Sequence, residues 1–346
     1  MSRQSATLRL GDALPFCSGM GADQRFYSFE EQAGRPVVLL LAAMASPPEM
    51  DALMAAFAAR RDAFEAKGAD LRLLVQLGAS GWLTAVPPEG LRLVHCPDRA
   101  IFEAAGAPAV LVADRALRLV ARLDITDPEA AAEAALAAIP DPGSSEATWP
   151  APVLLRPGLF DPEFCARLID RFETGDHVDG TVASLDPAGA LYNKLDAGKK
   201  RRRDLVLETD DPLQIEVAEV LSARLVPEIF RAFHAETAFI DRVVIARYDD
   251  TGGHFSRHRD NASPHLAYRQ FALSVNLNTG DYEGGALRFP EFNDLGYQPP
   301  AGAGIVFSAS LLHEASPVTK GSRYVLLTFL HSAAAEARRV AGARAA

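Results

Sequence analysis

The stretch YDDTGGHFSRHRD, residues 248–260, carries the two side chains on which the interpretation of the chain depends. On a β-strand, His258 and Asp260 would face the same side, because side chains two positions apart share a face. A second histidine, His313, follows the apolar run at 304–308. Two imidazoles and one carboxylate bind divalent metals such as iron and zinc. The sequence therefore predicts a metal site at these three residues and leaves the identity of the metal open.

The His-x-Asp spacing alone is a weak signal, because it also fits a surface strand with a charged pair. The flanking motifs are more specific. Phe255-Ser-Arg-His258-Arg-Asp260 fits an aromatic-x-x-His-x-Asp pattern, YEGGALRF at 282–289 fits a strand with a Gly-Gly turn, and HEASPVTKGSRY at 313–324 places Arg323 ten positions after His313. Together these motifs make residues 248–332 resemble the prolyl 4-hydroxylase-like branch of the Fe(II)- and 2-oxoglutarate-dependent dioxygenases.

That resemblance implies Fe(II) as the metal, 2-oxoglutarate as cosubstrate, dioxygen as oxidant and ascorbate as a further candidate cofactor. The implied reaction is hydroxylation of an unidentified substrate, such as a prolyl or other residue of a protein. Arg323 would bind the distal carboxylate of 2-oxoglutarate through two parallel hydrogen bonds, with Lys320 as the alternative cation. Tyr248 would donate its hydroxyl to the cosubstrate, and Asn276 would line the same site.

The chain is expected to fold as two domains, at 1–142 and 153–346, joined by a linker at 143–152 that is rich in proline, glycine and serine. The second domain contains two predicted helices, from Asp161 and at 212–233, followed by a terminal helix at 333–346. Short strands are predicted at 243–248, 271–277, 286–289, 304–308 and 324–330. Many short strands separated by turns favour a barrel or jelly roll, and the family resemblance implies a double-stranded β-helix.

The first domain alternates predicted strands and helices, which indicates an α/β fold. GDALPF at 11–16 and GRPVVL at 34–39 resemble the opening of peroxiredoxins and related thioredoxin-fold proteins. The resemblance implies a cis peptide bond at Ala107-Pro108. Ser46 stands where a peroxiredoxin would carry its reactive cysteine, so we expect no such peroxidase chemistry at that position.

Three cysteines, Cys17, Cys96 and Cys165, are far apart in the sequence and lack CxxC spacing. We therefore expect neither a disulfide framework nor a structural zinc site, and we interpret Cys17 and Cys96 as small buried hydrophobic residues. The net charge of −10 argues against nucleic acid as a partner. The chain shows no signal segment and no membrane span, which favours a cytoplasmic protein.

The basic segment 199–203, KKRRR, is conspicuous in an acidic chain. It is either a solvated loop or a lid that would favour an acidic peptide or protein substrate. Two further functions stay open. The chain could be a non-catalytic sensor whose thioredoxin-like domain binds a partner, or a thiol peroxidase that uses Cys17 or Cys96.

Overall fold

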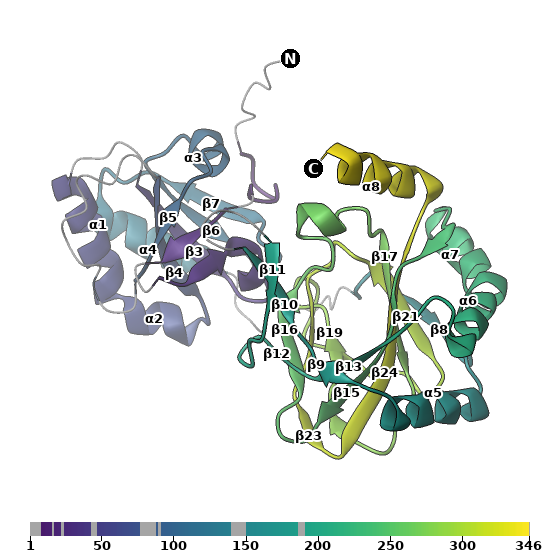
Figure 1. Cartoon of the computed structure of the whole chain (residues 1–346). Helices are drawn as coiled ribbons and strands as arrows, with labels where there is room; N and C mark the ends of the chain where they lie inside the picture. The colour runs from purple at the N-terminus through teal and green to yellow at the C-terminus, as the bar shows by residue number, and fades with distance from the viewer. Residues whose placement is uncertain are drawn as a thin grey trace. The chain divides into compact units, whose positions relative to one another are not determined.

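The computed structural model describes residues 8–15, 17–21, 24–42, 47–76, 88, 91–139, 150–185 and 191–345. The chain divides into two compact units, Met1–Pro150 with Pro290–Asp294, and Ala151–Phe289 with Leu295–Ala346 (Figure 1). Most of the predicted linker, residues 143–149, lies outside the described residues, as does Ser46. Within the described ranges, no helix is both long enough and apolar enough to cross a membrane.

The N-terminal unit contains a seven-stranded mixed sheet in the order β2-β1-β5-β4-β3-β6-β7. The three strands at 37–42, 70–76 and 92–96 run parallel, and the others are antiparallel to their neighbours. The strands are β1 (Ser18–Gly21), β2 (Phe26–Ser28), β3 (Val37–Ala42), β4 (Asp70–Gln76), β5 (Arg92–Cys96), β6 (Ala109–Ala113) and β7 (Leu119–Leu123).

Helices accompany this sheet: α1 (Pro47–Ala59), α2 (Arg61–Ala66), α3 (Ala100–Ala105) and α4 (Pro128–Ala138). The apolar run VVLLLA of β3 is buried at every position, as expected for a central strand covered on both faces. Phe57 of α1 and Phe64 of α2 stack on each other in the core that includes alternate residues of this strand. The predicted cis peptide bond at Ala107-Pro108 is present.

The C-terminal unit is built from short antiparallel strands in two main sheets. The larger sheet has the order β8-β21-β17-β24-β15-β13-β9, with β14 paired to β24, and the smaller has the order β12-β16-β22-β19-β20. This arrangement is that of a jelly roll. The larger sheet comprises β8 (Leu154–Arg156), β9 (Val178–Asp179), β13 (Arg203–Leu207), β14 (Phe239–Ile240), β15 (Val243–Asp249), β17 (Phe271–Asn276), β21 (Gly304–Ser308) and β24 (Ser322–His331).

The smaller sheet comprises β12 (Lys200–Arg201), β16 (His254–His258), β19 (Leu287–Arg288), β20 (Gly296–Tyr297) and β22 (His313–Ala315). Two further pairs are formed by β10 (Val182–Leu185) with β11 (Leu191–Lys194), and by β18 (Glu283–Gly284) with β23 (Val318–Lys320). The helices of this unit are α5 (Pro162–Thr174), α6 (Pro212–Arg224), α7 (Val226–Phe233) and α8 (Ala333–Ala345).

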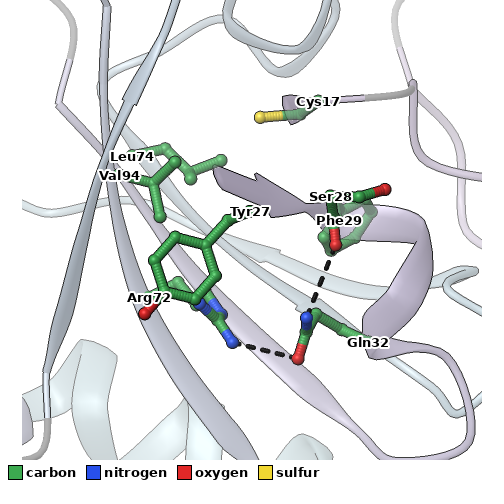
Figure 2. A pocket seen from close by; sticks show the side chains of 8 residues that line it. All are labelled: Cys17, Tyr27, Ser28, Phe29, Gln32, Arg72, Leu74 and Val94. Atoms are coloured by element: carbon green, nitrogen blue, oxygen red, sulfur yellow. Dashed lines mark hydrogen bonds between the residues drawn. The ribbon is translucent and has the colours of Figure 1, made fainter. Parts of the chain in front are cut away.

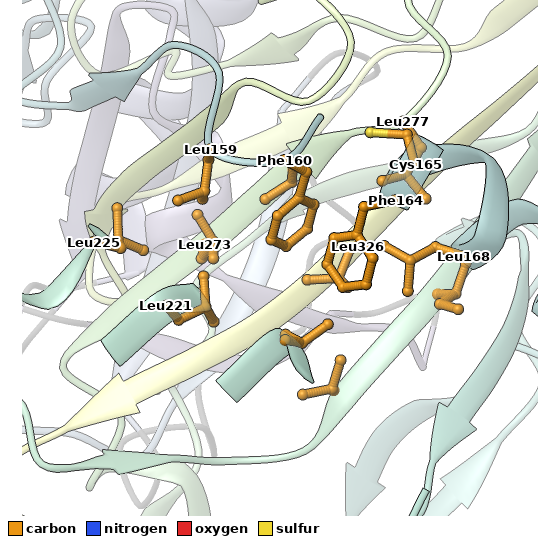
Figure 3. Close-up of a cluster of buried hydrophobic side chains, with 14 of the residues drawn as sticks. Leu159, Phe160, Phe164, Cys165, Leu168, Leu221, Leu225, Leu273, Leu277 and Leu326 are labelled. Atoms are coloured by element: carbon orange, nitrogen blue, oxygen red, sulfur yellow. The ribbon is translucent and has the colours of Figure 1, made fainter. Parts of the chain in front are cut away.

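The helices α5, α6 and α7 share one apolar core with the larger sheet. Figure 3 shows Phe164 and Leu168 of α5 together with Leu326 of β24 in this core. Asp161 begins α5 as predicted, because its side chain accepts a hydrogen bond from the Phe164 N–H. The single helix predicted at 212–233 is wrong: it is two helices separated at Leu225. Pro227, in the first turn of α7, lacks the N–H that a continuous helix would need.

Candidate metal centre

The predicted triad is assembled by the smaller sheet. In the pairing of β16 with β22, His258 lies directly opposite His313. The backbone N–H of Asp260 donates to the Ala309 carbonyl at 3.0 Å, which holds the turn after β16 in place. One ligand atom from each of the three residues lies within 4.8 Å of the others. The structure therefore brings His258, Asp260 and His313 to a single point.

Both imidazole rings have an orientation that suits metal binding. The Nδ1 of His258 lies 2.8 Å from the Ser256 carbonyl oxygen, and the Nδ1 of His313 lies 2.9 Å from that of Leu311. A carbonyl oxygen only accepts, so each Nδ1 carries the proton and each Nε2 keeps a free lone pair. Both Nε2 atoms face the Asp260 carboxylate. The His258 Nε2 lies 3.6 Å from one of its oxygens, and the His313 Nε2 lies 3.4 Å from the other.

The charges of the triad also match a divalent cation. Burial lowers the pKa of His313 to about 4, so this imidazole is neutral near pH 7. For Asp260, burial favours the protonated acid, but His313 and His258 outweigh it and lower its pKa to about 2. Neutral imidazoles and an ionised carboxylate are the protonation states that ligate metals. The residues present therefore fit a bound Fe(II) ion.

Aromatic rings hold the two histidines in place. Phe255 stacks on His258 with 3.5 Å between ring centroids, and Phe307 packs edge-on against His313 at 4.7 Å. Large apolar groups against both rings limit their rotation and exclude water from this side of the triad.

The three residues predicted to bind 2-oxoglutarate also meet. Arg323 of β24 is only 3% exposed and is paired with Tyr248 of β15. Its Nη2 donates to the Asn276 Oδ1 at 2.9 Å, and its guanidinium carbon lies 5.2 Å from the centre of the Tyr248 ring. Its Nε is buried without a hydrogen-bond partner among the described residues. A buried cation with an unsatisfied donor is suited to an anionic ligand.

The alternative cation, Lys320, does not share this environment. Its side chain is 74% exposed and its Nζ pairs with Glu283 at 3.0 Å. Gly285 of the Gly-Gly turn lies against Arg323. A Cβ at this position would meet the Arg323 Cδ at 2.9 Å, and the φ of +65° is one that glycine adopts more easily than other residues, so both observations explain why a glycine stands here. The Tyr282 hydroxyl, which we did not predict, is likewise buried without a partner among the described residues.

The basic segment 199–203 does not form a free lid. Its strand β12 pairs with β16, with Lys200 opposite Phe255. Because side chains alternate along a strand, Lys200 and Arg202 turn inward while Arg201 is exposed. Asp204 pairs with Lys200 at 2.9 Å and with Arg202 at 2.7 Å. The run of like charges concealed this alternation, so the buried cluster of Lys200, Arg202 and Asp204 was missed.

This cluster links Arg323 to the triad. Arg202 donates through Nη1 to the Tyr248 hydroxyl at 2.9 Å. Its guanidinium carbon also lies 5.5 Å from the centre of the Phe255 ring, which stacks on His258. A continuous series of contacts therefore runs from Arg323 through Tyr248, Arg202 and Phe255 to the triad.

Comparisons with known proteins cover the same part of the chain. Residues 243–331 match the model of the 2OG-Fe(II) oxygenase superfamily. A PKHD-type hydroxylase of Sphingopyxis alaskensis is 36% identical over 95 residues, which are 26% of this chain and 43% of that protein. A PKHD-type hydroxylase of Pseudomonas putida is 28% identical over 187 residues, which are 51% of this chain and 76% of that protein. The chain spans about half the length of the first curated relatives that it matches.

Two solved structures match about half of the chain. A viral collagen prolyl hydroxylase from Paramecium Bursaria Chlorella virus-1 gives a TM-score of 0.39 at 18% identity, covering 52% of this chain and 96% of that chain. A prolyl hydroxylase from Trichoplax adhaerens gives a TM-score of 0.42 at 15% identity, covering 54% of this chain and 86% of that chain. The candidate metal ligands His258, Asp260 and His313 and the buried Arg323 all lie within the match of residues 243–331 to the 2OG-Fe(II) oxygenase superfamily.

Proposed function

We propose that the C-terminal unit hydroxylates its substrate with Fe(II) held by His258, Asp260 and His313 and 2-oxoglutarate held by Arg323. The main support for this proposal is that two suitable sites occur in the same unit. One is a triad with two free Nε2 lone pairs, and the other is a buried cation without a carboxylate partner among the described residues. The first suits a metal ion and the second suits the distal carboxylate of 2-oxoglutarate.

Bound Fe(II) would couple the oxidation of 2-oxoglutarate by dioxygen to hydroxylation of a C–H bond. The protein's own groups bind and orient. The buried Arg323 would neutralise the distal carboxylate, and Asn276 holds the guanidinium in place. Because the Tyr248 oxygen already accepts a hydrogen bond from Arg202, its own O–H is directed elsewhere and is available to that carboxylate.

The substrate class is the least constrained part of the proposal. We propose a residue of a protein, such as proline, on the basis of the resemblance of residues 248–332 to prolyl 4-hydroxylases. An acidic substrate was expected from a basic lid. Two of the five basic residues, Lys200 and Arg202, are buried and paired with Asp204, which leaves Lys199, Arg201 and Arg203 as candidates to contact an acidic substrate.

We further propose that the N-terminal unit is thioredoxin-like and binds a partner or positions the substrate. Its parallel strands β3, β4 and β5, flanked by the antiparallel pair β6 and β7, support this assignment. An experimental structure of the full chain tests it: a different strand order in this unit would contradict it.

The proposed activity is tested by succinate formation from 2-oxoglutarate with Fe(II) and dioxygen. The wild-type chain should form succinate even without its substrate, through uncoupled turnover, and His313→Ala should lose this activity. His265→Ala is the matched control, because this histidine is exposed and lies outside the triad. Equal activity in wild type and His313→Ala would reject the proposal. No activity in the wild type with bound Fe(II) would favour the non-catalytic sensor.

A further inference from the structure

Two cysteines of the N-terminal unit meet although 79 residues separate them. Cys17 precedes β1 and Cys96 ends β5, and these strands pair with Met20 opposite His95. The two Sγ atoms lie 2.9 Å apart, with Cys17 3% and Cys96 0% exposed. The expectation that they are separate buried hydrophobic residues is therefore incomplete: they are buried, but as a thiol pair.

The strand pairing that joins the two sulfurs requires a glycine. A Cβ at Gly19 would lie 2.0 Å from the His95 carbonyl oxygen, so β1 could not approach β5 with a larger residue there. We propose that Cys17 and Cys96 are a redox-active dithiol that hydrogen peroxide converts reversibly into an intramolecular disulfide. A disulfide bond is about 2.05 Å long, so the sulfurs need to approach by only about 0.9 Å.

The two thiols are not equivalent. The hydrogen bond from Cys17, opposed by burial, lowers the pKa of Cys96, and the same contact raises the pKa of Cys17. Because the thiolate is the nucleophile, the lowered pKa favours Cys96 as the sulfur that attacks the oxidant. Cys17 keeps its proton at first and can release it later. Its Sγ, 2.9 Å from that of Cys96, is then placed to act as the second sulfur.

A small cavity lies beside Cys17. Figure 2 shows it, with Cys17 drawn above and the hydrogen-bonded pair Arg72 and Gln32 below. Arg72 is 3% exposed; its Nε binds Asp70 and its Nη2 donates to Gln32 at 2.9 Å. Its Nη1 is buried without a hydrogen-bond partner among the described residues. Because both sulfurs are buried, a small oxidant such as hydrogen peroxide can reach them more readily than a bulky disulfide.

The reaction balances with hydrogen peroxide as the oxidant. The Cys96 thiolate attacks one peroxide oxygen; the O–O bond breaks, an S–O bond forms, and the departing hydroxide takes the Cys17 proton. The Cys17 thiolate then displaces hydroxide from the Cys96 sulfur and forms the S–S bond. This hydroxide becomes water with the proton that Cys96 had lost. The sum is two thiols and one peroxide giving one disulfide and two waters. A small thiol reductant such as dithiothreitol returns the pair by exchange.

The test counts thiols in the reduced full-length chain before and after stoichiometric hydrogen peroxide, by alkylation under denaturing conditions. The chain has three cysteines, so the number of alkylated thiols should fall from three to one. Peptide mapping should find Cys17 joined to Cys96, and dithiothreitol should restore three thiols. Cys165→Ser is the matched control, because this cysteine is also buried but lies in the other unit. It should form the same bridge.

Two variants test the order of events. Cys17→Ser should accumulate a sulfenic acid at Cys96 that dimedone traps, whereas Cys96→Ser should give no comparable adduct at Cys17. Circular dichroism checks that both variants fold, and the wild-type mapping decides the main proposal if one does not. Three alkylated thiols after peroxide, a bridge that includes Cys165, or sulfinic acid at Cys96 without a bridge would each overturn it.

Discussion

Two buried arginines flank Tyr248 and differ in one respect. Arg202 donates to the Tyr248 hydroxyl and is neutralised by Asp204 at 2.7 Å. Arg323 lies over the Tyr248 ring, and among the described residues no carboxylate pairs with it. A buried charge without a partner is costly, so it persists where a ligand compensates it. Under the proposed function, Arg202 is a structural cation and Arg323 is the cation that binds 2-oxoglutarate.

The largest expected effect is on stability and concerns the structural cation. Asp204→Asn removes the carboxylate that neutralises both Lys200 and Arg202, and should lower the free energy of unfolding by about 3–5 kcal/mol. Urea unfolding followed by circular dichroism measures it. Asp210→Asn is the control, because Asp210 is exposed. A loss no larger than that of the control would mean that Arg202 is not held by this pair.

The binding cation should respond in the opposite way. Without 2-oxoglutarate, Arg323→Met should unfold at a urea concentration equal to or above that of the wild type, because an uncompensated buried charge is removed. With 2-oxoglutarate, the same variant should lose the charged contact, and the KM for this cosubstrate should rise roughly 30- to 1,000-fold. Initial rates of succinate formation measure it. An unchanged KM would place the cosubstrate elsewhere.

A smaller effect on cosubstrate binding is expected at Tyr248, the residue that both arginines contact. Tyr248→Phe keeps the ring over Arg323 but removes the hydroxyl, and should raise the KM for 2-oxoglutarate roughly five- to tenfold. The phenylalanine ring leaves Phe255 and the triad unaffected, so kcat should change less than KM. If kcat falls while KM stays constant, the hydroxyl acts on the reacting atoms and not on the cosubstrate carboxylate.

The smallest effect concerns the pH dependence of stability. Burial, together with the nearby Arg202, lowers the pKa of Lys200 from 10.5 to about 8. Between these values the unfolded chain binds more protons than the folded chain, so the unfolding free energy should rise with pH. Relative to Lys200→Met, which lacks the group, the wild type should gain on the order of 1 kcal/mol between pH 8 and pH 10. If the unfolding free energies of the wild type and Lys200→Met change equally with pH across this range, the lowered pKa of Lys200 is contradicted.

Local sequence patterns were sufficient where neighbouring residues act together. Asp161 and Pro162 marked the start of α5, and the apolar run of β3 marked a strand buried on both faces. The same patterns failed at the helix predicted for 212–233, where hydrophobic periodicity continues across Leu225 although Pro227 begins a new helix. Periodicity reports which face is buried and does not report where the backbone hydrogen bonds are interrupted.

The sequence by itself predicted the candidate ligands, because His258 and Asp260 are close along the chain, and it predicted Arg323 as the cosubstrate partner through the resemblance of the motif that begins at His313 to a known family. The tertiary structure alone decided that Arg202 is buried against Tyr248 and that Cys17 meets Cys96. These contacts depend on which strands pair and in which register, and a one-residue shift would turn each side chain to the opposite face. Strand partners far apart in the chain leave no local signal of their register.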